Sequence, residues 1–348
     1  MGIIGKPQSG KTTVFNAASG REEVVGDFSQ TSHRAVIKVP DERLVKIAAI
    51  VKPPKITQAE IEFLDSPEFT GQGKKATTFD ISPDLRQTDA LLVVIDAFSA
   101  NSHPAHDIQD LIDEMMLADQ VLIEGTISKK KKRIRLTGDR SENRELELLE
   151  KNLKFLEQEK PLIDLELNKD DWKLLRGYMF LSHKPILVVI NISEKDLSDR
   201  DGIYQKFSSW IVPGQRELAV LCGQIEMELI SLQPQERQAF LDDLGIAAPA
   251  VEQVIQKAYH LLGLISFITV EGPELRAWPV KKGTSARKAA GVVHSDIERG
   301  FIRAEVTPYE DFVAYKTPSA LKAAGKMRLE GRDYVVRDGD VILFRFNV

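Results

Sequence analysis

The chain has 348 residues, of which 43% are hydrophobic and 28% are charged, the balance of an ordinary globular protein with room for two or three domains. The formal net charge of −5 excludes a generally basic surface, so any nucleic-acid contact must come from a local patch. A single cysteine excludes a disulfide framework, and no run approaches the ~20 apolar residues that cross a bilayer. We therefore expect a cytoplasmic monomer, with neither a membrane nor DNA as its partner.

The first predicted elements form a phosphate-binding loop. The apolar run Gly2–Ile4 predicts a strand, and Thr13–Ala18 predict a helix that ends at Gly20. Between them, residues 5–12 read Gly-Lys-Pro-Gln-Ser-Gly-Lys-Thr and match the pattern G-x-x-x-x-G-K-[ST]. The alternative, a glycine-rich turn with an exposed lysine, is disfavoured by this strand–loop–helix context.

In such a loop the chemistry is divided between the backbone and two side chains. Glycines let backbone N–H groups turn inward around phosphates at the positive end of a helix. Lys11 is expected to reach the β- and γ-phosphates, and Thr12 to offer its hydroxyl to Mg²⁺. The residues predicted to contact the nucleotide here are Gly5, Lys6, Pro7, Gln8, Ser9, Gly10, Lys11, Thr12 and Thr13.

Apolar segments then recur between helical stretches, and several are nearly continuous β-branched runs. They predict strands buried on both faces of a parallel sheet, and therefore a doubly wound α/β domain. The segments are Ala35–Val39, Ile61–Leu64, Ala90–Ile95, Ile186–Ile190 and Leu218–Leu221. Asp65 follows one of them, at a strand end where an acidic residue commonly holds Mg²⁺ through water. We expect Asp65 to be a metal ligand and to act with Lys11 in catalysis; a turn aspartate is the alternative.

Asn191-Ile192-Ser193-Glu194 closes the fourth of these strands and predicts the site of the base. A guanine-specific protein places Asn-Lys-x-Asp here, and the aspartate accepts both N–H groups on one edge of guanine. Glu194 is one methylene longer, and Ile192 replaces the lysine that packs over the base. Because a site built around a hydrogen-bond pair loses its selectivity with that pair, we expect adenine rather than guanine. The alternative for Asn191 is a helix cap.

A long helical insertion separates the strands that end at Ile95 and begin at Ile186. Apolar residues spaced by three and four mark two helices: Ile108, Leu111, Met115, Ala118 and Leu122 in the first, and Leu146, Leu149, Leu153 and Leu156 in the second. They predict an antiparallel coiled-coil hairpin. Its tip carries a basic run, Lys129–Arg133, followed by Arg135. Either a solvated charged face or contact with a phosphate backbone explains that run.

The C-terminal third predicts a small mixed domain. Four segments have the composition of strands: Phe267–Val270, Arg276–Val280, Phe301–Val306 and Val341–Phe346. Ala286–Val292 predict a helix between them, and Asp338-Gly339 supplies a turn. His294 and Asp296 lack a partner nucleophile or metal-ligand set, so we expect them to be structural.

With these motifs the chain resembles the Obg-like ATPase (YchF) family over nearly its whole length. The phosphate loop, the Asn191-x-x-Glu194 motif and the helical insertion carry part of the likeness. The C-terminal third carries most of it, in the segments Arg276–Trp278, Lys282–Thr284, Ala289–Asp296, Gly300–Val306, Glu330–Tyr334, Asp338–Val341 and Phe344–Val348. Together these segments are highly specific.

The resemblance implies a P-loop NTPase domain, an inserted helical arm and a C-terminal β-grasp module called a TGS domain. The expected boundaries are residues 1–102 with 183–264 for the first, 103–182 for the arm and 265–348 for the TGS domain. The resemblance also implies ATP as the ligand rather than GTP, Mg²⁺ as the cofactor, and association with the ribosome or RNA.

Two further site assignments follow from the resemblance. Cys222 and Gly223 begin the loop on the base side, where the family usually has serine and a backbone N–H serves either way. For the switch residue linked to Mg²⁺, a gap-free register counted from Pro40-Asp41 selects Ser29, and a slip of one or two residues selects Thr31. We favour Thr31 because of its residue type.

Three departures from the family pattern bear on hydrolysis. The Asp-x-x-Gly switch reads Asp65-Ser66-Pro67-Glu68, so a glutamate stands where the family has the glycine that meets the γ-phosphate. Phe69 follows, which fits the hydrophobic residue of the family pattern and offers no catalytic side chain. The glycine-rich loop after it is shortened to residues 70–75. The loop that carries the family's candidate catalytic histidine is contracted, and neither His103 nor His106 aligns with it.

These observations leave two main functions open. The first is a molecular switch, in which ATP and Mg²⁺ order residues 27–34 and 65–75 and water attacks the γ-phosphate in line. The second is a nucleotide-sensing module without useful turnover, which Glu68 and the shortened loops favour. A GTP-preferring switch and a kinase are further alternatives, although we find neither the arginine-bearing lid nor the substrate base of a kinase.

Overall fold

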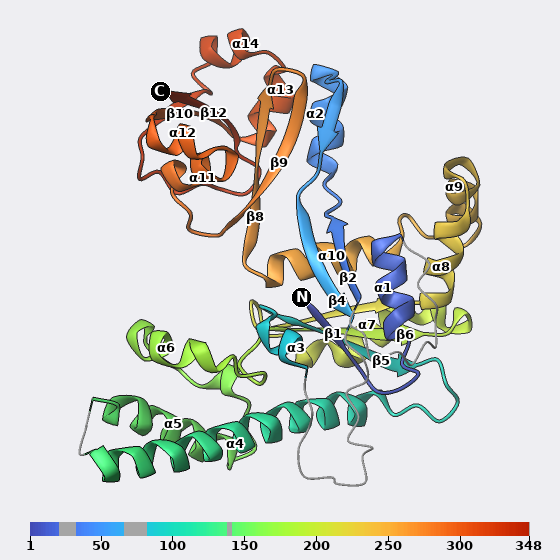
Figure 1. Ribbon diagram of the computed structural model, residues 1–348. Helices are drawn as coiled ribbons and strands as arrows, with labels where there is room; N and C mark the ends of the chain where they lie inside the picture. The colour runs from blue at the N-terminus through green and yellow to red at the C-terminus, as the bar shows by residue number, and fades with distance from the viewer. Residues whose placement is uncertain (21–32, 66–81, 138–140, 348) are drawn as a thin grey trace. The chain divides into compact units, whose positions relative to one another are not determined.

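The structure is a computed structural model that describes residues 1–20, 33–65, 82–137 and 141–347 (Figure 1). The chain forms two compact units. Met1–Ala35 and Phe63–Leu261 make up the first unit, and Val36–Glu62 and Leu262–Val348 make up the second. The second unit is thus built from two segments that are far apart in the sequence.

The first unit is organised around a six-stranded sheet with the order β2-β4-β1-β5-β6-β7. The strands are β1 (Gly2–Ile4), β2 (His33–Lys38), β4 (Glu60–Asp65), β5 (Leu91–Ala97), β6 (Ile186–Ile192) and β7 (Arg216–Leu221). β1 pairs in parallel with β4 and β5, and β6 pairs in parallel with β5 and β7. Every residue of β6 is buried, as expected of a central strand covered on both faces.

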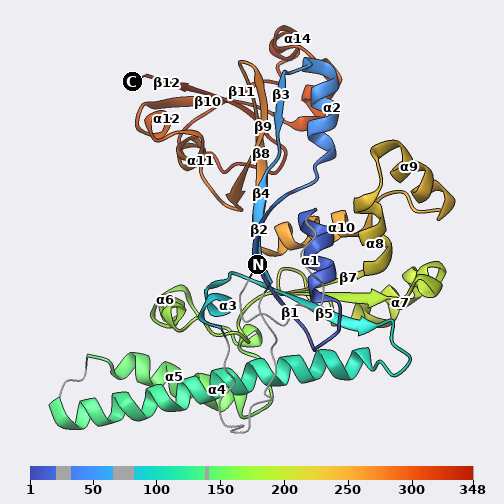
Figure 2. The ribbon, with the colours of Figure 1, turned by 45° about the vertical axis from the view of Figure 1, so that its right-hand side comes forward.

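Helices cover both faces of this sheet, which confirms the doubly wound fold. Figure 2 shows α1 and α10 on one face and α4 on the other. The α-helices of this unit are α1 (Lys11–Ser19), α3 (Pro83–Gln87), α4 (Pro104–Thr137), α5 (Asn143–Leu156), α6 (Lys169–Leu175), α7 (Arg200–Phe207), α8 (Gly223–Ser231), α9 (Pro234–Asp243) and α10 (Ala250–Leu261). Short 3-10 helices span Leu162–Asp164, Arg176–Tyr178, Glu194–Asp199 and Ser208–Trp210. No described helix is long and apolar enough to cross a membrane.

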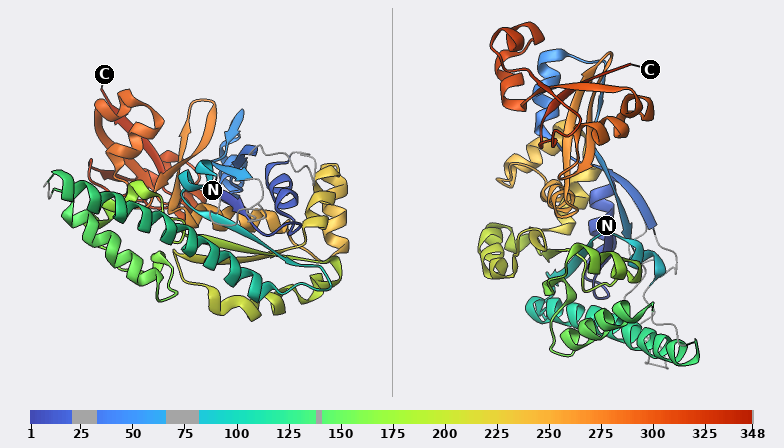
Figure 3. Two further views of the ribbon diagram at one scale, coloured as in Figure 1. Left: turned by 60° about the horizontal axis from the view of Figure 1, so that its bottom comes forward. Right: turned by 90° about the vertical axis from the view of Figure 1, so that its left-hand side faces the viewer.

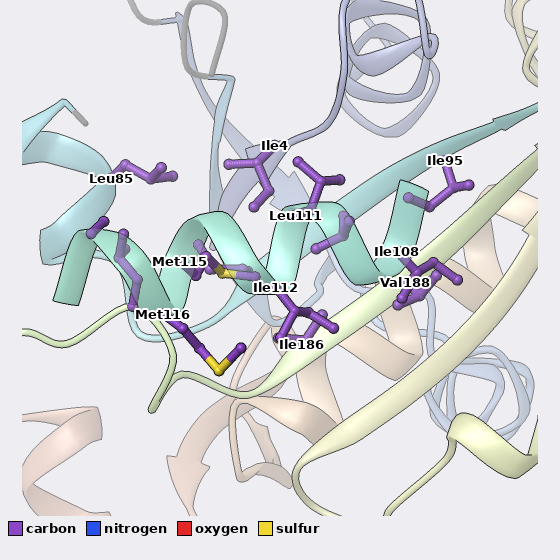
Figure 4. Packing of buried hydrophobic residues seen from close by; sticks show 14 of the residues in the cluster. Ile4, Leu85, Ile95, Ile108, Leu111, Ile112, Met115, Met116, Ile186 and Val188 are labelled. Atoms are coloured by element: carbon purple, nitrogen blue, oxygen red, sulfur yellow. The ribbon is translucent and has the colours of Figure 1, made fainter. Parts of the chain in front are cut away.

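The N-terminal half of α4 serves as a cover for the sheet. Figure 4 shows its apolar side chains packed against residues of β1, α3, β5 and β6. The cluster includes Ile108, Leu111, Ile112, Met115 and Met116 of α4 with Ile4, Leu85, Ile95, Ile186 and Val188. The apolar pattern that predicts a hairpin helix therefore also seals the core of the nucleotide domain, before α4 runs on beyond the sheet.

The C-terminal half of α4 and α5 form the predicted antiparallel pair (Figure 3, left). Acidic residues of α5 and of its N-cap neutralise much of the basic run. Lys130 Nζ lies 2.8 Å from Glu145 Oε2, Lys131 Nζ lies 2.7 Å from Glu150 Oε1, and Arg133 pairs with Glu142. The remaining described cations of the run, Lys129, Lys132 and Arg135, are exposed.

The second unit contains its own six-stranded sheet, with the order β11-β10-β12-β8-β9-β3. The strands are β3 (Lys55–Thr57), β8 (Leu264–Glu271), β9 (Glu274–Lys281), β10 (Phe301–Thr307), β11 (Arg328–Glu330) and β12 (Val341–Phe346). Its helices are α2 (Glu42–Val51), α11 (Ala286–Val293), α12 (Ser295–Arg299), α13 (Tyr309–Tyr315) and α14 (Pro318–Ala323). The four C-terminal strands and the helix predicted from the sequence are all present.

A small core of mixed aromatic and alanine residues holds this unit together. Phe267 and Phe344 pack edge to face with ring centroids 5.8 Å apart, over the alanine face of α11. β3 adds to the sheet edge by pairing in parallel with β9, with Ile56 opposite Leu275. His294 accepts a hydrogen bond from Asp296 N–H at the start of α12, the structural role expected of it. The TGS identity of the unit stays a prediction.

Candidate functional site

The predicted phosphate loop closes around its own lysine. β1 leads into the loop and α1 begins at Lys11, whose Nζ donates to the carbonyl oxygens of Gly5 and Lys6, each at 3.1 Å. Gln8 and Gly10 have φ angles of 62° and 93°, the positive values that turn the backbone back on itself. Lys11 is only 9% exposed. The fold therefore places an ammonium group inside a tight turn at the N-terminus of a helix, where anions bind.

Two glycines of the loop sit where a side chain has no room. A Cβ on Gly5 would lie 2.5 Å from the carbonyl oxygen of Val94 and 2.6 Å from Ser9 Oγ. A Cβ on Gly10 would lie 2.2 Å from Nδ2 of Asn191. Glycine at these positions lets the loop approach β5 and β6 closely.

Asn191 ties the loop to the neighbouring strand ends. Its Nδ2 donates to the carbonyl oxygen of Ser9 at 3.1 Å, and its Oδ1 accepts from Gly223 N–H at 2.9 Å. The side chain is 4% exposed, so both hydrogen bonds are shielded from water. The predicted phosphate loop, base motif and base-side loop thus meet at one side chain at the C-terminal edge of the sheet.

The two described residues predicted to bind Mg²⁺ lie side by side. Thr12 Oγ1 donates to Asp65 Oδ2 at 3.2 Å. Burial raises the pKa of Asp65, and the Thr12 hydroxyl and the charges of Lys11 and His33 oppose that rise. A hydroxyl beside a buried carboxylate is an oxygen donor set that suits Mg²⁺. Thr31 and its alternative Ser29 lie outside the described residues, as does Glu68.

The structure does not bring every predicted residue to the site. Ile192 is 1% exposed and packs in the core with Ile190 on the α4 side of the sheet. Because side chains alternate along a strand, Asn191 faces the phosphate loop and Ile192 cannot. The Ile192 side chain is therefore a core residue and offers no surface to a base. Glu194 begins a 3-10 helix and is exposed. Cys222 lies buried in the same core as Ile192, and burial raises the pKa of its thiol.

The remaining predicted contacts are spread around the loop. Pro7 and Gln8 are exposed at its tip, whereas Ser9 is 1% exposed. Thr13 lies against Gly223, since a Cβ on that glycine would be 3.0 Å from Thr13 Cγ2. The neighbourhood of Gly223 is therefore as crowded as that of the loop itself.

Lys6 makes contacts that the sequence does not predict. Its Nζ lies 2.6 Å from Asp107 Oδ1 and 2.5 Å from Asp110 Oδ2, both near the start of α4. Nδ1 of His106 lies 3.0 Å from the same Asp110 oxygen. The i, i+3 spacing of Asp107 and Asp110 places them on one helix face, which is the only sequence signal for this arrangement.

The fold and the loop together define a P-loop NTPase of the GTPase-like class with a second, C-terminal domain. A family profile described as a 50S ribosome-binding GTPase matches residues 1–134. A second profile, YchF-GTPase C-terminal, described as a protein of unknown function (DUF933), matches residues 264–347.

Whole-chain comparisons narrow the assignment. The chain is 38% identical to the ribosome-binding ATPase YchF of Bacillus subtilis and 36% identical to that of Pasteurella multocida, in each case over 100% of this chain and 99% of the relative. It is 25% identical to the solved structure of the Schizosaccharomyces pombe YchF GTPase, with a TM-score of 0.81 over 99% of this chain and 97% of that one. The chain belongs to the YchF family.

Proposed function

We propose that this protein is a Mg²⁺-dependent ATP-binding switch that hydrolyses ATP slowly and associates with the ribosome. The proposal depends on the geometry of the phosphate loop. The Lys11 ammonium lies inside the loop, and the hydrogen-bonded pair of Thr12 and Asp65 lies beside it at the C-terminal end of the strands. The relatives from Bacillus subtilis and Pasteurella multocida are named ribosome-binding ATPases, which supports both the ligand and the partner.

Each residue has a distinct task in the proposed chemistry. Lys11 exchanges its two carbonyl acceptors for the β- and γ-phosphate oxygens, and the backbone of residues 5–10 surrounds the phosphates. Thr12 and Asp65 would hold Mg²⁺, which would supply positive charge against the charge that develops on the transferring phosphoryl group. Water attacks in line, and Lys11 stabilises the same charge. Thr31 completes the metal site in this proposal.

ATP is proposed over GTP because the base motif lacks the aspartate that reads guanine. Glu194 stands in its place with an exposed side chain, and Asn191 is already engaged by Ser9 and Gly223. The names of the relatives differ on this point, since the solved relative is called a GTPase. Competition of ATP and GTP for the purified protein decides the question, and a strong preference for GTP would refute this use of Glu194.

The test of nucleotide binding is calorimetric titration with Mg²⁺–ATP, followed by single-turnover hydrolysis. Lys11→Ala should reduce affinity and turnover, because it removes the ammonium inside the loop. Lys132→Ala serves as the control, since it removes an exposed lysine from the far end of α4. Absence of binding to the folded wild-type protein would end the proposal.

A second candidate function is a nucleotide-sensing module without useful turnover. Glu68 favours it, because a carboxylate in place of the switch glycine brings negative charge toward the γ-phosphate. The same single-turnover experiment separates the two functions. ATP binding together with a hydrolysis rate that Lys11→Ala leaves unchanged would select the sensing module.

Ribosome association is tested by sedimentation with ribosomes, with and without a non-hydrolysable ATP analogue. We propose that the arm, residues 103–182, and a TGS domain, residues 265–348, supply the contacts. On the arm, Lys129, Lys132 and Arg135 are exposed and form no ion pair with a described carboxylate, whereas Lys130 and Lys131 pair with Glu145 and Glu150. A switch requires that sedimentation depends on the nucleotide, so nucleotide-independent comigration would contradict it.

A further inference from the structure

The phosphate loop carries a second lysine, Lys6, whose ammonium contacts α4. Lys6 Nζ contacts Asp107 at 2.6 Å and Asp110 at 2.5 Å, with side-chain exposures of 36%, 17% and 33% for the three residues. Burial lowers the pKa of Lys6, but the hydrogen bonds to the two carboxylates outweigh it and leave the pKa raised. The same contact lowers the pKa of Asp110.

A third carboxylate lies one turn further along the same helix face. Glu114 has an oxygen, Oε2, that is buried without a hydrogen-bond partner among the described residues. Burial raises the pKa of Glu114, and the charge of Lys6 acts against that rise. Lys6 is therefore the cation that balances a stripe of acidic side chains directly beneath the phosphate loop.

This stripe would oppose the binding of a triphosphate if it were not neutralised. His106, Asp107 and Asp110 offer ligand atoms within 4.8 Å of one another, a spacing that also suits a divalent cation. The Lys6 ammonium already contacts both carboxylates, however, so the positive charge is supplied by the loop itself. The carbonyl oxygen of Lys6 is also one of the two acceptors of Lys11 Nζ, so Lys6 lies next to the ammonium that is proposed to bind the phosphates.

We propose that Lys6 is a charge-compensating residue of the phosphate loop, which cancels the negative charge of this face of α4 by pairing with Asp107 and Asp110. The inference rests on the proposed nucleotide binding and adds a residue that acts through these two carboxylates rather than on the phosphates. α4 has 34 residues and is continuous to Thr137. It is therefore about 50 Å long, and one rigid element joins the loop to the tip of the arm.

The test compares the Mg²⁺–ATP affinity of four proteins by calorimetry: wild type, Lys6→Leu, Asp107→Asn/Asp110→Asn, and the combination of all three changes. Lys6→Leu should weaken binding roughly tenfold, because two carboxylates that contact the phosphate loop lose their counter-charge. The triple variant should bind within about threefold of wild type, since the repelling charges are gone. The loss in Lys6→Leu should shrink as salt is added.

Lys131→Leu is the matched control, because it breaks a 2.7 Å lysine–carboxylate pair between α4 and α5, far from the loop. It should leave the affinity unchanged. If Lys6 instead has a purely structural role, the triple variant should bind Mg²⁺–ATP no more tightly than Lys6→Leu does. That result, or an unchanged affinity in Lys6→Leu, overturns the proposal.

A ligand-free measurement keeps this inference separate from the proposed function. The pKa of the Asp110 carboxyl, followed by NMR in wild type and in Lys6→Leu, should rise in the variant because the lysine lowers it. Failure of wild type to bind Mg²⁺–ATP refutes the proposed function, whereas an unshifted Asp110 pKa refutes the pairing. Both measurements use the full chain.

Discussion

Replacing Asn191 by alanine tests whether this side chain holds the phosphate loop in place. The change removes the hydrogen bond that Nδ2 donates to Ser9 O at 3.1 Å and the one that Oδ1 accepts from Gly223 N–H at 2.9 Å. Both backbone groups then lose their partner in a site where Asn191 itself is only 4% exposed. A buried polar group left without a partner costs about 1–3 kcal/mol.

The expected loss in the free energy of unfolding is about 2–4 kcal/mol, because water that enters the vacated space recovers part of the two bonds. This raises the unfolded population about 30- to 1,000-fold. Asn191→Asp should also destabilise the protein, because its carboxylate can accept from Gly223 but faces the Ser9 carbonyl oxygen without a proton to donate.

The assay is urea unfolding followed by far-UV circular dichroism and by the fluorescence of Trp172 and Trp210, which lie in the first unit. Asn101→Ala is the control, because it removes the same atoms from an exposed turn and should change stability by less than about 0.5 kcal/mol. A loss below about 1 kcal/mol in Asn191→Ala would show that the loop does not depend on this tie.

Three further outcomes are expected. Gly10→Ala should destabilise the first unit by more than about 1–2 kcal/mol and abolish Mg²⁺–ATP binding in calorimetry. The reason is that φ at this position is 93° and the new methyl group would meet the Asn191 side chain. Unimpaired binding would contradict this geometry. Burial raises the pKa of Asp65 in the folded protein, so the folded state favours the protonated carboxyl. The stability that this protonation contributes is present at low pH and is lost as pH rises through the folded pKa. Asp65→Asn should therefore stabilise the ligand-free protein at pH 7 but not at pH 3, and equal effects at both would refute the assignment. Asp119→Ala should lower the free energy of unfolding by about 3–5 kcal/mol, measured by thermal or urea unfolding. It removes a fully buried carboxylate that accepts hydrogen bonds from Leu181 N–H and Ser182 N–H and pairs with the guanidinium of Arg86. A loss under about 1 kcal/mol would be inconsistent with that network.

The phosphate loop can be predicted from the sequence because its chemistry requires particular residue types at a fixed spacing. Gly5 and Gly10 stand where the structure leaves no space for a Cβ, and Gly20 caps α1 with a φ of 64°, as predicted. The strands of the first sheet are readable for a similar reason. Burial on both faces requires unbroken apolar runs such as residues 186–190, and those runs became strands.

Features that depend on pairing between distant segments leave little local signal. β3 is only three residues long, and nothing in Lys55–Thr57 indicates that it pairs with β9. The contact of Lys6 with α4 is equally hidden, because its partners lie about a hundred residues further along the chain. Ile192 is the opposite case. The sequence motif predicts that it contacts the base, but side chains alternate along a strand and its side chain packs in the core.

Charge runs also need their structural partners before they can be interpreted. Lys130 and Lys131 belong to a basic run that by itself indicates a solvated or phosphate-binding tip. The return helix brings Glu145 and Glu150 against them, so only part of the run keeps its charge available. The antiparallel hairpin was predicted, but its register across the turn was not, and the register decides which cations are neutralised.

The discontinuous second unit limits how this protein can be dissected. Val36–Glu62 belong to that unit although they interrupt the first one in sequence, so no single cleavage of the chain yields two intact pieces. A fragment that stops at Leu261 would keep α2 and β3 but lose β9 and α13, their neighbours in the fold. Leu44 and Ile47, now at most 1% exposed, would then face water, and the fragment would tend to aggregate rather than report on nucleotide binding alone.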